Sequence, residues 1–351
     1  MPALDTAAFG QPVEVGQIGR AIKKLWETDA GATTRASLVN FAIVCRGLDA
    51  MQRNTEVISE FTSQHACRAL LVGIAPNSDS EPRVSAWIDA HCHLSRAGAK
   101  QICCEQITFL FEGHSEARIA NTLFANLDSD LPLYLWWQGE FPNPIDETLW
   151  AWVDRLIYDS LEWNDARAQF MRLRESIDRA QAGLILCDLN WARSLHLRQA
   201  LSQMFDHPDN LALLARLSAI TIAHAPENRS TALLLTSWFA AQMKFTDPVP
   251  SGPGFIFQRE GASPITIGLH AETGRSISRC ELRCEDGSVR LQRDQQGDFF
   301  RVEVRIGPDR LYHHLLPAGS NATTSLLLWE IGGGSRHQVY RKALGVFETL
   351  L

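Results

Sequence analysis

The histidines and cysteines of one predicted β-hairpin are the first residues whose types could do chemistry. His91, Cys92 and His93 lie in one expected strand, and Cys103 and Cys104 lie in the next. Imidazole and thiolate groups bind zinc, but zinc sites favour tight clusters of ligands. Neighbouring strand residues point to opposite faces, so only one of the two adjacent cysteines can reach the face that holds both histidines. The pattern favours a partly exposed hairpin face, and we expect no bound metal.

Three further segments could contact an anion or a metal. Asp128-Ser-Asp130 has the Asp-x-Asp form that holds a metal and a sugar nucleotide, but it precedes a strand, which favours a turn and cap. The Gly332–Gly334 loop, centred on Gly333, could form an anion-binding backbone nest or simply connect two elements. Arg68 starts a strand, where it could meet a phosphate or carboxylate of a partner, although a structural ion pair is favoured.

Motifs with a defined catalytic mechanism are absent from the sequence. It contains no Gly-x-Gly-x-x-Gly, no phosphate-loop Gly-Lys-Ser/Thr, no Gly-x-Ser-x-Gly and no His-Glu-x-x-His. The residues therefore give no reason to expect a cofactor. An enzyme acting on a sugar or sugar phosphate would have to use Asp128, Asp130 or the Gly332–Gly334 loop, and we keep it as the competing hypothesis.

The other cysteines resemble small apolar side chains. Cys45 and Cys187 end apolar runs, where a free thiol packs as a hydrophobe. Cys280 and Cys284 lie in an expected strand, which would separate them by roughly 13 Å and prevent a disulfide unless a bulge or turn brings them together. We therefore expect no regulatory disulfide between these two cysteines.

The segment Asp130–Pro142 is the most distinctive strand signal. A short apolar run ends in Trp136 and Trp137, and Gly139 and Pro142 break it directly afterwards. The two indoles must point to opposite faces of a sheet. Either both pack under helices, or one of them lies in a recognition crevice at the carboxyl end of the strand.

The elements that position these residues divide the chain in two. Strand and helix signals alternate up to residue 246, which predicts an α/β domain over 1–246 with a largely parallel open sheet and helices on both faces. The Pro- and Gly-rich segment Asp247–Gly254 predicts a linker. Short alternating strands and a terminal helix then predict a smaller β-rich domain over 255–351.

Charge and hydropathy limit the partners and the cellular compartment that we expect for the protein. The net charge is −7, whereas sequence-independent binding of nucleic acid needs a dense positive surface, so we expect no nucleic-acid partner. No apolar run approaches a membrane span, and the first residues lack the order of a secretory signal. We therefore expect a cytoplasmic protein.

Several segments, in order along the chain, resemble conserved blocks of the OpcA family. The Trp-Trp strand and the Asp-Leu-x-Trp-x-Arg segment together are the most specific, and in His65–Val72 an alanine replaces the family's proline. The similar segments are His65–Val72, Leu131–Pro142, Asp188–Arg193, Ser230–Phe239, Leu326–Glu330 and Tyr340–Leu344.

The resemblance implies a non-enzymatic role. Members of the family are assembly proteins and allosteric effectors of glucose-6-phosphate dehydrogenase in the oxidative pentose phosphate pathway. The expected partner is that dehydrogenase, and aromatic anchors are typical of such interfaces. We expect the contact surface to include the loop from Gln138 to Pro144. The residues expected in it are Trp136, Trp137, Gln138, Gly139 and Trp191.

Overall fold

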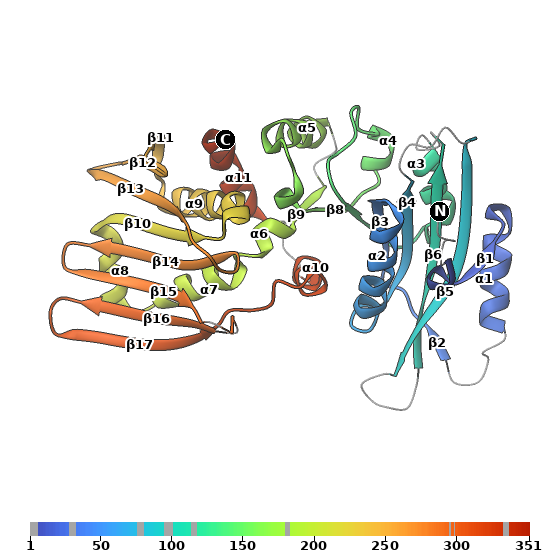
Figure 1. Cartoon of the computed structure of the whole chain (residues 1–351), viewed down its shortest axis with the longest axis horizontal. Coiled ribbons are helices and arrows are strands. Elements are labelled where there is room, and N and C mark those ends of the chain that lie inside the picture. The colour runs from blue at the N-terminus through green and yellow to red at the C-terminus, as the bar shows by residue number, and fades with distance from the viewer. Residues whose placement is uncertain are drawn as a thin grey trace. The chain divides into compact units, whose positions relative to one another are not determined.

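The chain folds into two compact units, Met1–Cys187 and Asp188–Leu351 (Figure 1). The computed structural model describes residues 6–27, 33–75, 81–94, 101–113, 118–179, 183–294, 296–297, 299–332 and 337–351. The longest helices in these ranges have 15 residues, and none of the described helices is long and apolar enough to cross a membrane.

The first unit is built on a sheet that we call sheet A. Its strand order is β1-β5-β6-β4-β3-β7-β8-β9, and β2 pairs with β6. Pairing is parallel from β6 through β8, whereas β1 and β5 are antiparallel to their neighbours. The strands are β1 (Gln11–Val13), β2 (Thr33–Arg35), β3 (Val39–Arg46), β4 (Cys67–Ile74), β5 (Arg83–Leu94), β6 (Gln101–Glu112), β7 (Leu133–Trp137), β8 (Arg155–Tyr158) and β9 (Ile185–Asp188).

Helices of the first unit pack against sheet A through their apolar stripes. α2 lies on β3 and β4, and its Phe61 ring is 4.7 Å from that of Phe41 on β3. Gly73 on β4 leaves the space that the Met51 side chain of α2 occupies. α1 contacts β5. The helices are α1 (Ile18–Glu27), α2 (Leu48–Thr62), α3 (Ile119–Asn126), α4 (Glu147–Trp150) and α5 (Ala166–Arg179).

The second unit contains an eight-stranded sheet, sheet B, in the order β11-β12-β13-β10-β14-β15-β16-β17. Only the pairing of β10 with β13 is parallel among those that the structure describes. The strands are β10 (Leu217–His224), β11 (Thr246–Ser251), β12 (Gly254–Arg259), β13 (Ala262–Ala271), β14 (Ile277–Cys284), β15 (Gly287–Arg293), β16 (Phe299–Ile306) and β17 (Arg310–Pro317).

Helices cover one face of sheet B. α9 lies on β10 and β13, α7 on β17 and α8 on β16, while α11 packs against α9. Ile222, Cys280, Leu291 and Val302 occupy adjacent register positions on the covered face and are buried. The helices are α6 (Leu189–Ala192), α7 (Leu195–Met204), α8 (Pro208–Ala215), α9 (Arg229–Met243), α10 (Thr323–Gly332) and α11 (Gln338–Leu350).

The predicted fold class is confirmed: a largely parallel sheet with helices is followed by a β-rich region. The division of the chain, however, differs from the expected boundary after residue 246. β10 joins sheet B, because its two partners, β13 and β14, come later in the chain. The segment expected as a linker forms β11 and the turn into β12, where Pro248 and Pro250 sit on an edge strand that tolerates them.

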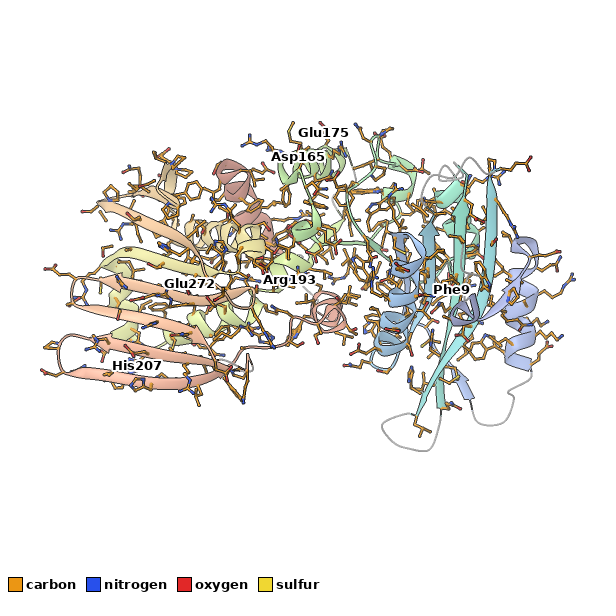
Figure 2. The ribbon with its side chains drawn as sticks, viewed as in Figure 1. Phe9, Asp165, Glu175, Arg193, His207 and Glu272 are labelled. Carbon is orange, nitrogen blue, oxygen red and sulfur yellow. A yellow bond between two sulfur atoms is a disulfide. The ribbon has the colours of Figure 1, made fainter. Side chains whose placement is uncertain are left out.

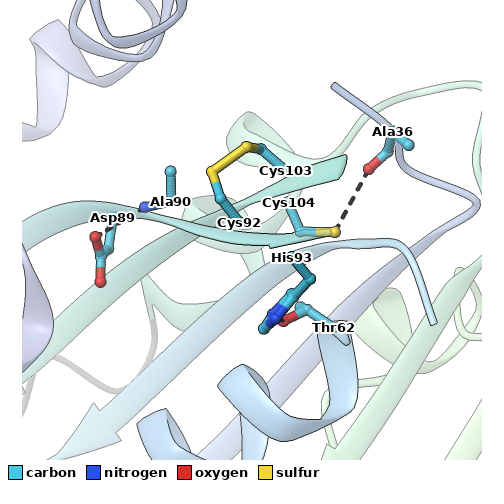
Figure 3. Close-up of a disulfide and its surroundings, with 8 residues drawn as sticks. All are labelled: Ala36, Thr62, Asp89, Ala90, Cys92, His93, Cys103 and Cys104. Atoms are coloured by element: carbon cyan, nitrogen blue, oxygen red, sulfur yellow. Dashed lines mark hydrogen bonds between the residues drawn. A yellow bond between two sulfur atoms is a disulfide. The ribbon is translucent and has the colours of Figure 1, made fainter. Parts of the chain in front are cut away.

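The hairpin of β5 and β6 corrects the expectation of free cysteines. Cys92 and Cys103 lie opposite each other in antiparallel register, with Cα atoms 4.1 Å apart, and form a disulfide (Figure 3). His91 instead bonds Gln106, and His93 bonds the Thr62 hydroxyl. In this hairpin, both histidines are thus bonded to other side chains, and Cys92 and Cys103 to each other.

Candidate functional site

Trp136 and Trp137 are core residues rather than exposed anchors. They are 4% and 6% exposed at the end of β7, between β3 and β8. The indole N–H of Trp137 donates to the Glu140 carbonyl at 3.0 Å, whereas the buried indole N–H of Trp136 has no acceptor among the described residues. Of the two arrangements expected for this strand, the structure therefore has the one in which both indoles pack inside the unit. Neither tryptophan is an exposed anchor.

The loop after β7 is held in place from both sides. Gln138 exchanges two hydrogen bonds with Asn54 of α2, at 2.9 and 2.8 Å. Gly139 has a φ of 77°, which favours glycine, and its carbonyl accepts from the Trp163 indole at 3.1 Å. The Phe141 ring is buried. These contacts preorganise the segment from Gln138 to Phe141.

Trp191 lies in the second unit and is also buried. Asp188 caps α6 through the Asn190 N–H and accepts a hydrogen bond from Tyr340. The guanidinium of Arg198 stands 3.5 Å above the Trp191 ring. Burial lowers the pKa of Arg198 to about 9, against the opposing effect of the Glu330 charge.

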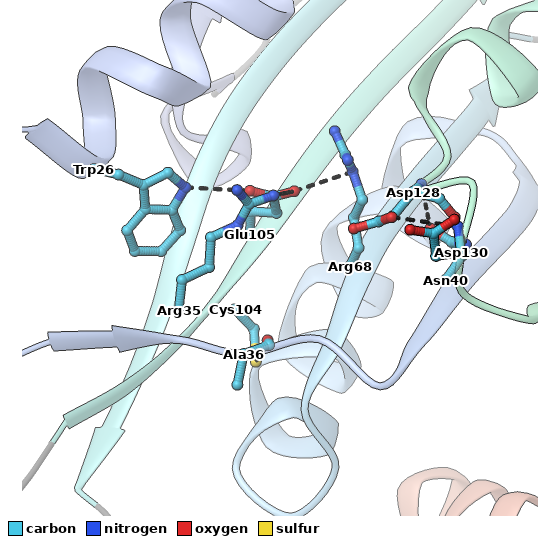
Figure 4. Close-up of polar contacts among 9 residues, drawn as sticks. All are labelled: Trp26, Arg35, Ala36, Asn40, Arg68, Cys104, Glu105, Asp128 and Asp130. Carbon is cyan, nitrogen blue, oxygen red and sulfur yellow. Dashed lines mark hydrogen bonds and ion pairs between the residues drawn. The ribbon is translucent and has the colours of Figure 1, made fainter.

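A cavity of about 480 Å³ opens beside Trp191, Arg198 and the half-exposed Trp329. The structure thus places Trp191 in a different unit from the Trp-Trp loop. Gly333, the centre of the proposed anion nest, falls outside the described residues. Asp128 and Asp130 form the expected turn: the Asn40 side chain bonds both the N–H and the carbonyl of Asp128 (Figure 4).

Arg68 makes the ion pair that its position favoured. Its Nε lies 3.0 Å from Oε1 of the buried Glu105 on β6, without a well-aligned hydrogen bond (Figure 4). The same carboxylate accepts from Arg35 at 2.9 Å and from the Trp26 indole at 3.2 Å. Sequence reasoning missed Arg35, Glu105 and Trp26. The register of β2, β4 and β6 brings Arg35 and Arg68 to Glu105, and α1, which contacts β5, supplies Trp26.

Sequence reasoning also missed the face of sheet B opposite the one that the helices cover. On β14, β15 and β16, the side chains of this face alternate along each strand with the buried side chains of the covered face. The side chains of this face include five arginines and two glutamates. We call this set the arginine face. It consists of Arg279, Glu281, Arg283, Arg290, Arg301, Glu303 and Arg305.

The arginine face has a regular charge pattern. Its central row runs Glu281, Arg290, Glu303 across three strands. Arg279 pairs with Glu272, which is labelled in Figure 2, and Glu281 bonds Arg283 at 2.6 Å. The five arginines outnumber Glu281, Glu303 and the neighbouring Glu272. Because the whole chain has a net charge of −7, this surface is opposite in sign to the protein as a whole.

Leucines border the arginine face along β17. Arg301 is paired in register with Leu315, and Arg305 with Leu311. Both leucines are strongly exposed, at 66% and 44%. Exposed arginines beside exposed apolar side chains form the composition that is enriched at protein–protein interfaces.

Glu281 gives the arginine face a measurable pH dependence. The hydrogen bond from Arg283 holds the pKa of Glu281 below its ordinary value of 4.5, with further lowering by nearby arginine charges. Its contribution to stability is therefore complete above the unfolded-state pKa and is lost as the pH falls through the folded-state pKa. We expect Glu281→Gln to lower the free energy of unfolding by about 1–2 kcal/mol at pH 7.

This difference between wild type and Glu281→Gln should shrink as the pH falls through the folded-state pKa of Glu281, as measured by urea unfolding across the pH range. Glu303→Gln is the control, because the structure records no arginine hydrogen bond to that carboxylate among the described residues. A Glu281→Gln penalty that does not change between pH 7 and pH 3 would contradict the assignment.

The fold and these surfaces define a two-unit α/β protein with a buried Trp-Trp strand and an uncovered, arginine-rich sheet. Two family models match it: the glucose-6-phosphate dehydrogenase subunit N-terminal domain over residues 58–175, and the corresponding C-terminal domain over residues 185–344. The chain belongs to the OpcA family. The division between the two units, after Cys187, lies close to residue 185, where the second match begins.

Curated relatives are similar over part of the chain. The "Putative OxPP cycle protein OpcA" of Nostoc punctiforme is 28% identical over 193 residues, which is 54% of this chain and 40% of that protein. The protein of the same name in Synechococcus elongatus is 27% identical over 195 residues, 54% and 42% of the two chains. The matched part thus spans about two fifths of these relatives.

Solved structures share only a distant likeness. A levoglucosan dehydrogenase in complex with NADH and L-sorbose has a TM-score of 0.43 and 12% identity over 90% of both chains. An oxidoreductase from Sinorhizobium meliloti has a TM-score of 0.46 and 9% identity, over 90% of this chain and 88% of that one.

Proposed function

We propose that this protein is a non-catalytic assembly factor and allosteric activator that binds a glucose-6-phosphate dehydrogenase in the oxidative pentose phosphate pathway. The observation that carries the proposal is the pair of family matches, because both matched models are described as parts of a glucose-6-phosphate dehydrogenase subunit and together they span most of the chain.

An allosteric activator must have different affinities for the active and inactive forms of its enzyme. A partner that binds the active oligomer of an enzyme more tightly than its inactive forms shifts the population toward the active oligomer by that difference. A surface that contacts two subunits, or one subunit in its assembled conformation, supplies such a difference. The role therefore requires a sizeable interaction surface.

The arginine face is the surface we propose for the dehydrogenase. Arg301 and Arg305 are exposed, and the structure records no ion pair for either within the described part of the chain. Exposed cations that lack partners in the free protein are available to acidic groups of another protein, and Leu311 and Leu315 add apolar area beside them. The chemistry that fits is an acidic surface with an apolar rim.

The loop from Gln138 to Pro144 remains a second proposed contact. Its tryptophans now have a different role from the one expected, since Trp136 and Trp137 support the loop from inside. Glu140 is exposed in this loop and lies next to the preorganised Gly139. A held, exposed loop lowers the entropic cost of binding.

The proposal is tested by assaying the cognate dehydrogenase with and without the purified protein over a range of glucose 6-phosphate. We expect a lower apparent KM or a higher kcat, and co-elution of the two proteins on a sizing column. The protein alone should show no turnover. Unchanged kinetics together with separate elution would overturn the proposal, and turnover by the protein alone would favour the competing enzyme hypothesis.

A further inference from the structure

A pocket on the first unit has the charge and shape of a small-molecule site. It encloses about 480 Å³ and is lined by Ile22, Lys23 and Trp26 of α1 together with Arg35 and Arg68. Ligand pockets of proteins commonly enclose roughly 300–1,000 Å³. The lining combines apolar and aromatic side chains with two guanidinium groups, so the pocket is amphipathic.

Buried Glu105 holds the two arginines at the edge of this pocket (Figure 4). The carboxylate is 1% exposed and receives Arg35, Arg68 and the Trp26 indole N–H at 2.9, 3.0 and 3.2 Å. Hydrogen bonds from Arg35 and Trp26, together with the ion pair with Arg68, hold both guanidinium groups and the indole ring around this carboxylate. The site is therefore preorganised in the absence of a ligand.

The charges at the pocket do not balance within the described residues. Two arginines share one buried carboxylate, and Lys23 adds a third cation, whereas Glu27 is the acidic group on the pocket lining. The side chain of Arg68 is 15% exposed, and among the described residues the structure records no other ion pair or hydrogen bond for its guanidinium. Arginine binds phosphate through paired N–H groups, and this geometry suits an anion with two negative charges.

We propose that this pocket binds a phosphomonoester of a small organic molecule. Arg35, Arg68 and Lys23 contact the phosphate, and Ile22 and Trp26 contact the organic group. The volume exceeds that of a free phosphate ion, and the partly exposed indole offers a flat apolar surface beside the cations. The assignment does not depend on the dehydrogenase partner, because all of its residues lie in the first unit.

The test is calorimetric titration of the whole protein with phenyl phosphate, inorganic phosphate and succinate at low ionic strength. We expect phenyl phosphate to bind at least tenfold more tightly than the other two, a difference of about 1.4 kcal/mol. No heat of binding for phenyl phosphate up to about 10 mM would overturn the proposal. Equal affinity for succinate and phenyl phosphate would also overturn it, because the pocket would then not distinguish a phosphate from a carboxylate.

Substitutions of the lining residues test whether phenyl phosphate binds in this pocket. Arg68→Gln should weaken phenyl phosphate at least tenfold, and Lys23→Gln should weaken it severalfold while leaving all contacts of Glu105 in place. Lys23→Gln therefore keeps the test valid if Arg68→Gln fails to fold. Arg53→Gln, an exposed arginine on α2, is the matched control and should bind as wild type does. Equal binding by wild type and Lys23→Gln would place the ligand elsewhere.

Discussion

Trp136→Ala is expected to lower the free energy of unfolding of the first unit by about 3–5 kcal/mol. The indole is 4% exposed on β7, whose neighbours β3 and β8 pair with it on both sides, so truncation leaves a large cavity in the middle of sheet A. The cavity cannot collapse without moving paired strands. The measurement is amide hydrogen exchange. We expect β3 and β7 of the first unit to lose protection, and β14 of the second unit to keep it.

Phenylalanine variants separate packing from hydrogen bonding at the two tryptophans. Trp136→Phe removes an indole N–H that has no acceptor in the described part of the chain, so we expect its cost to be set by the lost volume. Trp137→Phe also removes the donor to the Glu140 carbonyl, which we expect to add about 1 kcal/mol and to loosen the loop. Trp152→Ala is the control, because that side chain is 63% exposed. A Trp136→Ala variant as protected as wild type would contradict the core assignment.

Charge reversal on the arginine face is expected to have the second large effect, on the affinity for the dehydrogenase. The double variant Arg301→Glu/Arg305→Glu is expected to weaken binding to the dehydrogenase at least tenfold, or about 1.4 kcal/mol. Two exposed cations that lack intramolecular ion pairs in the described structure become anions facing an acidic partner. Binding is measured by titration, and activation by the glucose 6-phosphate dependence of the rate.

A matched double variant controls for the change in net charge. Arg229→Glu/Lys244→Glu makes the same change at the two ends of α9, on the covered side of sheet B, and should leave binding intact. Added salt should weaken the wild-type complex more than the Arg301/Arg305 variant, because fewer opposed charges remain to be screened. Equal activation by both double variants would remove the arginine face from the interface.

The sequence by itself determined the fold class, most of the strands and the family. Alternating strand and helix patterns are local, and each depends on residues only two to four positions apart. Short blocks such as Leu131–Pro142 and Asp188–Arg193 also specify the family without knowledge of any contact. The ion pair of Arg68 was anticipated for the same reason, since a charged residue at the start of a buried strand needs a counterion.

The tertiary structure alone decided sheet membership, cysteine pairing and the proposed sites. β10 belongs to sheet B because of partners far along the chain, and Cys92 meets Cys103 because the hairpin register sets them opposite each other. The arginine face needs three strands in register before its charges form rows. Glu105 gathers donors from three separate elements. Such arrangements depend on strand order and register, which side-chain periodicity within one strand does not encode.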